Sequence, residues 1–459
     1  MHMDIRSAIR SALRTSMGAD ISQPILPSTI NLTSAQYVLG LTGSTSTTKN
    51  AARVYGRAAM SIWAGVITGT EAKITANSDA GTLDQLISVA IDGGEFSHAA
   101  HVGSLYTLFT GQPQASRFVE IRYGSAFGNG PYILSTGNVL QVTGQPPSVA
   151  PITDWTQLGV DSSTSFSNSP LVANVATYTP QISAGKGTYG SAIANIKLRG
   201  AFNNLYVAIN GDLRKVGVSK DGQAPTFYSV ATESNKPLRV MKIPCDGTLA
   251  TYYVWDDGNG RSGGGHFSVA GDATRQDVGL QRRMDQYGDS ITYGTGPGAT
   301  PADVDTMPAA AALGFVGSTY GIGGYTIAQC IGLLDTILPV KTVTANDVAI
   351  LTIGRNNIPT ITTQDELDYA TCIDKLLAKG YGKVICRGVL PLPNGTDGFL
   401  TENAALQAVM VAKANPKLVW VPTDTWIGWG STDSVHPTAA GYVTIKNFAI
   451  PAYTTALGL

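Results

Sequence analysis

Short alternating runs of apolar and polar residues dominate the first 280 positions of the chain. Residues 86–91 form one such run and end at the turn sequence Asp-Gly-Gly, and residues 117–123 alternate in the same way. A period of two is typical of strands that bury one face, and Gly, Asn, Asp and Pro between the runs indicate tight turns. The region from about residue 26 to 280 is therefore predicted to be all-β.

The all-β region divides at a proline-rich segment, residues 144–151, which is the best candidate for a linker. Patterns from before this segment recur after it. Residues 216–222 repeat the strand and turn of 89–94, and residues 238–243 repeat the alternation of 118–123. We therefore predict two jelly-roll or β-sandwich modules that are distant repeats of each other. The predicted modules are residues 26–147 and 148–280.

From about residue 280 the hydrophobic period changes. Residues 347–353 form a nearly continuous apolar run, which is typical of a buried strand in a parallel sheet. Residues 363–377 have a helical period and an acidic first turn, and Gly380 follows them. Strands alternating with helices predict an α/β domain with a parallel sheet over residues 281–459. Its other predicted elements are strands at 383–390 and 418–422 and helices at 400–414 and 439–457.

The first 25 residues show a helical pattern instead. Apolar residues recur on one stripe and three arginines lie away from it: Ile5, Ala8, Ile9, Ala12, Leu13 and Met17 on the stripe, and Arg6, Arg10 and Arg14 outside it. Residues 1–25 are predicted to form a short helical segment, either packed on the body of the protein or used for attachment or assembly. Residues 1–17 lack the apolar core of a secretory signal, and His2-Met3 is also consistent with a cloning scar.

The composition narrows the class of protein. The 31 basic and 32 acidic residues leave a net charge of −1, so neither nucleic acid nor an anionic membrane is expected as the main partner. Charged residues make up 14% of the chain, against about 25% in an ordinary globular protein. Gly, Ser and Thr take their place, as in many extracellular β-rich proteins. No stretch approaches the roughly 18 apolar residues of a membrane-spanning helix.

Cysteine and histidine spacing gives no metal motif. Of the four cysteines, Cys330, Cys372 and Cys386 lie on apolar segments of the last domain and are predicted to be buried free thiols. His98 and His101 are three residues apart in a loop of the first β module, and we interpret them as surface residues.

Three chemically suited residues lie on connections of the predicted α/β domain. Ser290 follows a predicted strand, and Asp433 and His436 lie before the last helix, so a nucleophile, an orienting acid and a base occur in a workable order. Asn356 follows another strand. Such connections are where an open α/β sheet binds ligands. Taken singly, Asp289 next to the serine and Asn356 could be turn residues, and Asp433 a helix cap.

Taken together, these residues resemble the motifs of the SGNH (GDSL-type) hydrolase family. The matching blocks are Gly-Asp-Ser at 288–290, a glycine within 321–326, Gly-x-Asn at 354–356 and Asp-x-x-His at 433–436. The resemblance covers roughly residues 280–459 and implies a three-layer α/β fold with a parallel sheet.

The resemblance also implies roles for individual residues. Ser290 would attack an ester carbonyl, His436 would take and return the serine proton, and Asp433 would hold the imidazole in the useful tautomer. The backbone N–H groups of Ser290 and Gly324 and the side-chain amide of Asn356 would form the oxyanion hole. This mechanism needs no cofactor and no metal.

Two positions depart from the family pattern. The strand before Ser290 is unusually polar, so Asp285 and Gln286 are expected either to face the preceding β module or to mark an edge strand. Asn357 stands where the family usually has aspartate, in a position expected to brace the loop without touching the substrate.

The family includes lipases, thioesterases, arylesterases and carbohydrate deacetylases, so the fold does not decide the substrate. β modules ahead of such a domain resemble the arrangement in carbohydrate esterases that remove acetyl groups, and a serine esterase acting on an O-acetylated polysaccharide is expected. Trp426 and Trp429 are candidates for the acyl pocket or a sugar-stacking face, or equally for the core. Arg355 could meet an acidic sugar or point to water, and Tyr293 is expected to border the pocket.

Other functions stay open at this point. One alternative is a lipase or thioesterase acting on small or lipid esters. Another is a glycan-binding or virion structural protein with a vestigial esterase domain. An extracellular location is expected, for a secreted enzyme or for one carried on a phage tail fibre. Homo-oligomerisation or virion attachment would use the N-terminal helix.

Overall fold

The computed structural model describes residues 28–31, 37–40, 60–75, 87–123, 139–144, 146–152, 155–157, 190–209, 215–229, 239–256, 267–278, 282–296, 299–393, 399–433 and 435–459. These residues fall into two compact units, one built mainly of residues within 64–151 and the other mainly of residues 152–459. The predicted N-terminal helix and Gln145 of the predicted linker lie outside the described residues. Within the described part, no helix is long and apolar enough to span a membrane.

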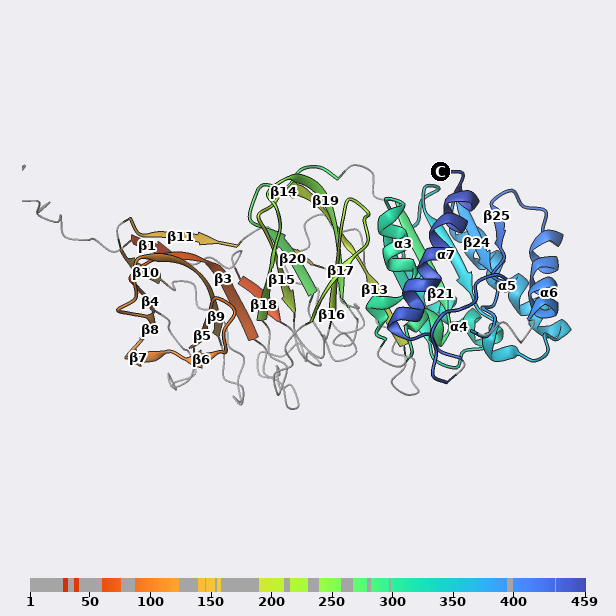
Figure 1. Cartoon of the computed structure of the whole chain (residues 1–459), viewed down its shortest axis with the longest axis horizontal. Coiled ribbons are helices and arrows are strands. Elements are labelled where there is room, and N and C mark those ends of the chain that lie inside the picture. Colours follow the sequence, from red (N-terminus) through yellow and green to blue (C-terminus); the bar gives the residue numbers. More distant parts are fainter. Residues whose placement is uncertain are drawn as a thin grey trace, which may run out of the picture. The chain divides into compact units, whose positions relative to one another are not determined.

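The described strands within residues 28–151 form two antiparallel sheets (Figure 1). Every second side chain of β4 and β10 is buried, so one face of their sheet packs inward. The alternating run predicted at 117–123 does not bury one face only, because every residue from Arg117 to Arg122 is buried. The first sheet has the order β1 (Ser28–Asn31), β10 (Val139–Thr143), β4 (Glu71–Thr75), β8 (Leu105–Phe109) and β7 (Ala100–Val102). The second has the order β11 (Ser148–Pro151), β3 (Met60–Gly69), β9 (Ala115–Tyr123), β5 (Ile87–Ile91) and β6 (Ser97–His98), and β2 (Tyr37–Gly40) pairs with β3.

The second β module also has two antiparallel sheets, and one apolar core joins them. Leu198, Val216 and Val254 of one sheet pack with Leu205 and Val269 of the other. One sheet has the order β12 (Thr156–Gln157), β20 (Phe267–Gly271), β15 (Asn204–Ile209) and β18 (Arg239–Pro244). The other has the order β14 (Ile196–Ala201), β19 (Leu249–Asp256), β16 (Lys215–Lys220) and β17 (Thr226–Ser229).

The two modules share a turn, as the sequence repeat suggested, but the strands assigned to it were partly wrong. Asp92 after β5 and Asp221 after β16 both have φ of +50°, and a glycine with positive φ follows each. Asp92 exchanges hydrogen bonds with the backbone of Phe118 on β9, and Asp221 does so with Thr251 on β19. The equivalent of β9 is therefore β19, whereas the sequence repeat matches residues 238–243 to it, of which 239–243 lie in β18.

The C-terminal domain is built on a six-stranded sheet within the described residues, and five of the strands run parallel. The sixth, β13, lies in the sequence region assigned to the second β module and pairs antiparallel with the edge of the sheet. The order is β13 (Gly190–Ala194), β22 (Val316–Ile322), β21 (Arg283–Gly288), β23 (Val348–Thr352), β24 (Lys383–Arg387) and β25 (Leu418–Val421).

Helices cover both faces of this sheet and make two separate cores, so the domain has three layers (Figure 1). One face is covered by α4 (Ile327–Ile337), α5 (Thr363–Lys379) and α6 (Leu400–Ala412), and the other by α3 (Thr306–Ala312) and α7 (Ala439–Leu457). Shorter turns are α2 (Ser290–Tyr293), η3 (Pro301–Asp303), η4 (Leu338–Val340) and η5 (Arg355–Asn357).

Helix α5 shows how the local sequence sets these elements. The Thr362 hydroxyl accepts a hydrogen bond from the backbone N–H of Asp365, and the Asp365 carboxylate accepts one from the backbone N–H of Thr362, which closes a capping box at the start. Gly380 ends the helix with φ of +102°, as predicted. The predicted buried free thiols Cys330, Cys372 and Cys386 are also confirmed.

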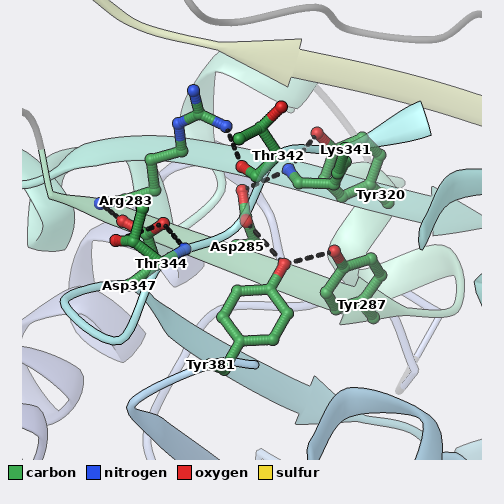
Figure 2. Close-up of polar contacts among 9 residues, drawn as sticks. All are labelled: Arg283, Asp285, Tyr287, Tyr320, Lys341, Thr342, Thr344, Asp347 and Tyr381. Atoms are coloured by element: carbon green, nitrogen blue, oxygen red, sulfur yellow. Dashed lines mark hydrogen bonds and ion pairs between the residues drawn. The ribbon is translucent and has the colours of Figure 1, made fainter. Parts of the chain in front are cut away.

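The expectation for the polar strand before Ser290 was wrong. Strand β21 lies between β22 and β23 and is not an edge, and Asp285 does not face the β module. Its carboxylate is buried against the Nζ of Lys341 at 2.7 Å and the hydroxyl of Tyr381 at 2.7 Å (Figure 2). Lys341 also donates to the hydroxyl of Tyr320, and Tyr287 and Tyr381 share a hydrogen bond. The polar residue is satisfied by partners distant in the sequence.

Candidate active site

The nucleophile candidate lies where the chain reverses direction across the parallel sheet. From β21 the chain crosses to β22 on one side and returns to β23 on the other, and Ser290 follows the end of β21 directly. An open α/β sheet binds ligands at such a switch point, beyond the carboxyl ends of its strands. Gly288 has no room for a Cβ, which would overlap Thr292 and Thr352. This close packing brings Ser290 tightly over the end of the sheet.

Polar side chains beneath Ser290 hold the short helix that it begins. Gln286 donates through Nε2 to the hydroxyls of Thr352 at 3.0 Å and Thr292 at 3.3 Å, and it accepts a hydrogen bond from Thr306. The hydroxyls of Thr292 and Thr352 lie 2.6 Å apart. Gln286, the other polar residue of β21, therefore fixes helix α2 from below.

The structure brings Ser290, His436 and Asp433 together. Nε2 of His436 lies 3.0 Å from Oγ of Ser290, and Nδ1 of His436 lies 2.6 Å from Oδ2 of Asp433. This is the order of contacts that a base needs if one ring nitrogen is to face the nucleophile and the other is to be held by a carboxylate. The histidine side chain is 23% exposed and Ser290 is 5% exposed, so the contact between them lies at the edge of the surface.

Asp433 is held by its own loop in the ionised form. Burial raises the pKa of its carboxyl, but hydrogen bonds from the backbone N–H and side chain of His436 and the backbone N–H of Val435 outweigh burial and lower the pKa. The backbone bonds measure 2.7 Å from His436 and 2.9 Å from Val435. Asp433 does not cap the last helix, because Thr438 is the N-cap of α7.

Asp289, next to the nucleophile, has the opposite electrostatics. Its carboxylate is buried and accepts a hydrogen bond from the backbone N–H of Ile291 at 3.0 Å, which caps α2. Burial raises the pKa of Asp289 to about 6, although this hydrogen bond and the charge of the buried Arg387 act against the shift. The side chain does bond within its own loop, as the turn interpretation supposed.

The oxyanion candidates Gly324 and Asn356 lie on two loops that are tied to each other. Gly324 has φ of +76°, a conformation that favours glycine. Asn356 donates through Nδ2 to the carbonyl of Tyr325 at 2.8 Å. Both candidates are exposed. Among the described residues, no hydrogen bond joins either of them to Ser290, His436 or Asp433.

Asn357 braces the same two loops. Its Oδ1 accepts from the backbone N–H of Ile327 at 3.0 Å, and its Nδ2 donates to Oδ1 of Asp365 at 2.5 Å. An aspartate could make the first of these bonds but not the second. The departure from the family pattern is therefore matched by an acceptor on α5.

The candidate substrate-binding residues fare differently. Trp426 and Trp429 are 4% and 2% exposed and pack in the core under α7, and Trp426 stacks on Phe448, so their burial does not agree with a sugar-stacking face. The guanidinium of Arg355 lies over the ring of Phe399 and donates to the carbonyl of Leu390 at 3.3 Å, so it does not simply point to water.

Tyr293, the remaining substrate candidate, is half-buried at the end of α2.

Tyr442 was not singled out from the sequence. Its hydroxyl donates to the carbonyls of Ile291 at 2.9 Å and Thr295 at 3.2 Å, and so joins α7 to the helix that Ser290 begins. Both partners lie about 150 residues away, separated by 151 and 147 positions, so no local pattern could have indicated them. Among the described residues, no group of three or more His, Cys, Asp or Glu side chains could hold a metal.

A protein-family model matches most of the C-terminal domain. Residues 287–443 match the family model described as GDSL-like lipase/acylhydrolase. The C-terminal region is a GDSL-like lipase/acylhydrolase domain. Because this family is one of acyl hydrolases, the chain carries a carboxylic ester hydrolase. No curated protein matches the sequence.

Several solved structures are similar to the chain that carries this GDSL-like domain. A carbohydrate esterase family 2 enzyme with a carbohydrate-binding domain from Corynascus thermopiles (Myceliophthora fergusii) has 16% identity and a TM-score of 0.42, covering 66% of this chain and 100% of its own. A family 2 carbohydrate esterase from Clostridium thermocellum, solved with cellohexaose, has 16% identity and a TM-score of 0.42, with 59% and 94% covered. A putative GDSL-like lipase from Bacteroides ovatus has 13% identity and a TM-score of 0.41, with 59% and 84% covered.

Proposed function

We propose that the chain is a serine esterase in which Ser290, His436 and Asp433 act as the catalytic triad. The observation that supports this most directly is the unbroken pair of contacts at His436, 3.0 Å to the serine hydroxyl and 2.6 Å to the aspartate. The lowered pKa of Asp433 suits the same role, because an ionised carboxylate stabilises the imidazolium that forms when His436 takes a proton.

The reaction runs in two halves. Oγ of Ser290 attacks the ester carbonyl as Nε2 of His436 accepts the serine proton, and the imidazolium then protonates the leaving alcohol, which leaves an acyl group on Ser290. Water, activated by His436, then releases the acid. The oxyanion is stabilised by the backbone N–H groups of Ser290 and Gly324 and by Asn356, whose amide has a second N–H besides the one bonded to Tyr325.

We propose an O-acetyl group on a polysaccharide as the substrate. A site for long acyl chains would need a continuous apolar groove. No such groove is indicated near His436: among the described residues of the domain, Ile427 is the one exposed large apolar side chain in the loop that leads to His436. The others are on helices or at the C-terminus: Leu367, Leu400, Val411, Val443 and Leu459. The β modules ahead of the domain also support a polysaccharide substrate, because this arrangement resembles that of carbohydrate esterases that remove acetyl groups. A secreted or virion-borne location stays a prediction.

The test is acetate release by wild type and Ser290→Ala from acetylxylan and from an acetylated bacterial capsule, with p-nitrophenyl acetate and octanoate in parallel. We expect release by the wild type alone and a steep fall from acetate to octanoate. Preference for octanoate with no release from either glycan would support a lipase or thioesterase instead. Equal inactivity of both proteins on every ester would contradict the esterase proposal.

A further inference from the structure

The β region before the catalytic domain contributes directly to the catalytic sheet. Strand β13 pairs with β22 from Gly190 opposite Ile322 to Ala194 opposite Ser318, and the backbone N–H of Asn195 donates to the carbonyl of Gly317 at 3.0 Å. From Asn195 the chain continues at once into β14 of the module. One extended stretch thus belongs to both structures, and it borders the strand that leads to the Gly324 loop.

A second contact joins the module to the turn η3, which follows the nucleophile helix. Nζ of Lys215 on β16 lies 2.9 Å and 2.8 Å from the two carboxylate oxygens of Asp303. The indole N–H of Trp255 on β19 donates to the carbonyl of Ala302 at 2.9 Å. Trp255 is fully buried and packs with Ala302 and Met307. The turn is therefore held by charge, by a hydrogen bond and by apolar packing.

The Asp303 carboxylate, which pairs with Lys215, also fixes the backbone at Thr300, in the loop before η3. Oδ2 of Asp303 accepts hydrogen bonds from the backbone N–H of Thr300 at 2.8 Å and from its hydroxyl at 3.0 Å. The Asp303 side chain is only 5% exposed, so without Lys215 its charge would be buried without a counterion.

The other end of this loop touches the catalytic residues. Gly296 has no room for a Cβ, which would overlap the carbonyl oxygen of Pro437, the residue after His436. Thr295 accepts a hydrogen bond from Tyr442, and its backbone N–H donates to the carbonyl of Ser290 at 3.0 Å. The backbone N–H of Ala299 donates to the carbonyl of Gly296 at 3.1 Å, so hydrogen bonds between described residues connect the module contact at η3 to the backbone beside Ser290 and Pro437.

We propose that Lys215 and Trp255 of the second β module are positioning residues for the active site. By fixing Asp303 and Ala302 they hold the loop against Pro437 and keep His436 at proton-transfer distance from Ser290. A displacement of about 1 Å can cost up to two orders of magnitude in rate, so a loose brace has a measurable effect. The proposal rests on the proposed function, because it takes Ser290 and His436 as the reacting pair.

The test compares two lysines on the same strand. Lys215→Met removes the brace. Lys220→Met is the matched control, because Lys220 forms its ion pair with Asp246 inside the module, at 2.5 Å. With p-nitrophenyl acetate and butyrate, we expect Lys215→Met to lower kcat/KM about tenfold, mainly through kcat and equally for both esters. Lys215→Arg should recover most of the loss, and Lys220→Met should match the wild type.

Hydrogen exchange supplies a readout that does not depend on turnover. Amides of residues 299–305 should exchange faster in Lys215→Met than in Lys220→Met. Trp255→Phe removes the indole N–H, and it takes the place of Lys215→Met if that variant does not fold. Kinetics and exchange equal to those of Lys220→Met would overturn the positioning proposal alone. Wild-type activity that survives Ser290→Ala would instead overturn the proposed function.

Discussion

Strand β21 has a polar network at each end, and the two differ in what they can do. Near its start, Asp285 and Lys341 form an ion pair whose side chains are 0% and 3% exposed (Figure 2). Just beyond its other end, Ser290 faces His436, whose pair with Asp433 is 23% and 47% exposed. Both networks join a carboxylate, a nitrogen base and hydroxyl groups. Only the second, within the described residues of these two networks, combines that chemistry with access for a ligand.

Perturbed ionisation does not by itself mark a catalytic site. Burial raises the pKa of Tyr287 and Tyr381 in the first network. Burial is the largest influence on Lys341 and by itself would lower the pKa, but the charge of Asp285, the Tyr320 hydroxyl and the hydrogen bonds to both together raise that pKa. These groups satisfy one another and are sealed from water. We infer a structural role for the first network and a chemical role for the second.

The largest expected effect separates the two networks by activity. His436→Ala should lower kcat/KM roughly 10³- to 10⁴-fold or more, because the serine proton loses its acceptor, and Asp433→Asn should come close to this by favouring the wrong tautomer. The melting temperature should change little, since both side chains reach the surface. Steady-state kinetics with p-nitrophenyl acetate and thermal melts measure the two effects. A fall of only a few-fold in the kcat/KM of His436→Ala would contradict a chemical role for the second network.

The next effect concerns stability. Lys341→Met should lower the free energy of unfolding by about 3–5 kcal/mol, because it leaves Asp285 charged and buried without its partner. The activity of the folded enzyme should stay within a few-fold of wild type. Adding Asp285→Asn should restore part of the stability, since the uncompensated charge is removed. Denaturant unfolding together with kinetics checks both points, and a selective loss of kcat at full stability would contradict the structural role.

Asp289 combines features of both networks, because it is buried like the first network but lies next to Ser290 of the second. Its pKa is raised from 3.8 to about 6, so the folded protein keeps the proton over a range in which the unfolded chain has lost it. Stability from this group is therefore full below about pH 4 and is lost as pH rises towards 6. Asp289→Asn keeps an acceptor for the Ile291 N–H but does not titrate.

Relative to wild type, the stability of Asp289→Asn should therefore improve between pH 4 and pH 6.5, by up to about 3 kcal/mol. Urea unfolding of both proteins at several pH values in this range measures the difference. The test is how the difference in unfolding free energy changes with pH. Its absolute value is not informative, because the extra amide hydrogens of asparagine add a cost that does not depend on pH. A difference that does not vary with pH would mean that Asp289 is already ionised at the lower end of the range.

The smallest effect tests the brace behind the Gly324 and Asn356 loops. Asn357→Asp should cost about 1–2 kcal/mol of stability, because it replaces a hydrogen bond to Asp365 by two facing carboxylates. A few-fold fall in kcat/KM should accompany it. Combining this change with Asp365→Asn restores one donor and one acceptor and should recover both losses. No recovery in the double variant would show that the pair does not act as a unit.

The fold of the catalytic domain could be read from the sequence where the signal is local. Helix α5 was predicted because its period, acidic first turn and closing Gly380 lie in one stretch. β13 and the partners of Asp285 could not be predicted, because they depend on residues far apart in the chain. Lys341, for example, lies 56 positions from Asp285. A polar residue in a strand indicates that a partner exists, but not where.

The same limit applies to the candidate site. Ser290, Asp433 and His436 could be proposed because motif spacing and family resemblance carry them, and the structure brings them together. Trp426 and Trp429 were ambiguous since a tryptophan near a site can be core or surface, and only packing decides. The contact of Lys215 with Asp303 left no pattern in the sequence, because the two residues lie 88 positions apart.

We propose Ser290 as the nucleophile and His436 as the base that activates it. The most direct measurement is labelling with a fluorophosphonate, which acylation-competent serines attack, followed by peptide mass spectrometry of wild type, Ser290→Ala and His436→Ala. We predict stoichiometric modification of the peptide that contains Ser290 in the wild type, none in Ser290→Ala and greatly slowed labelling in His436→Ala. Modification at another serine, or none in the wild type, would contradict the account.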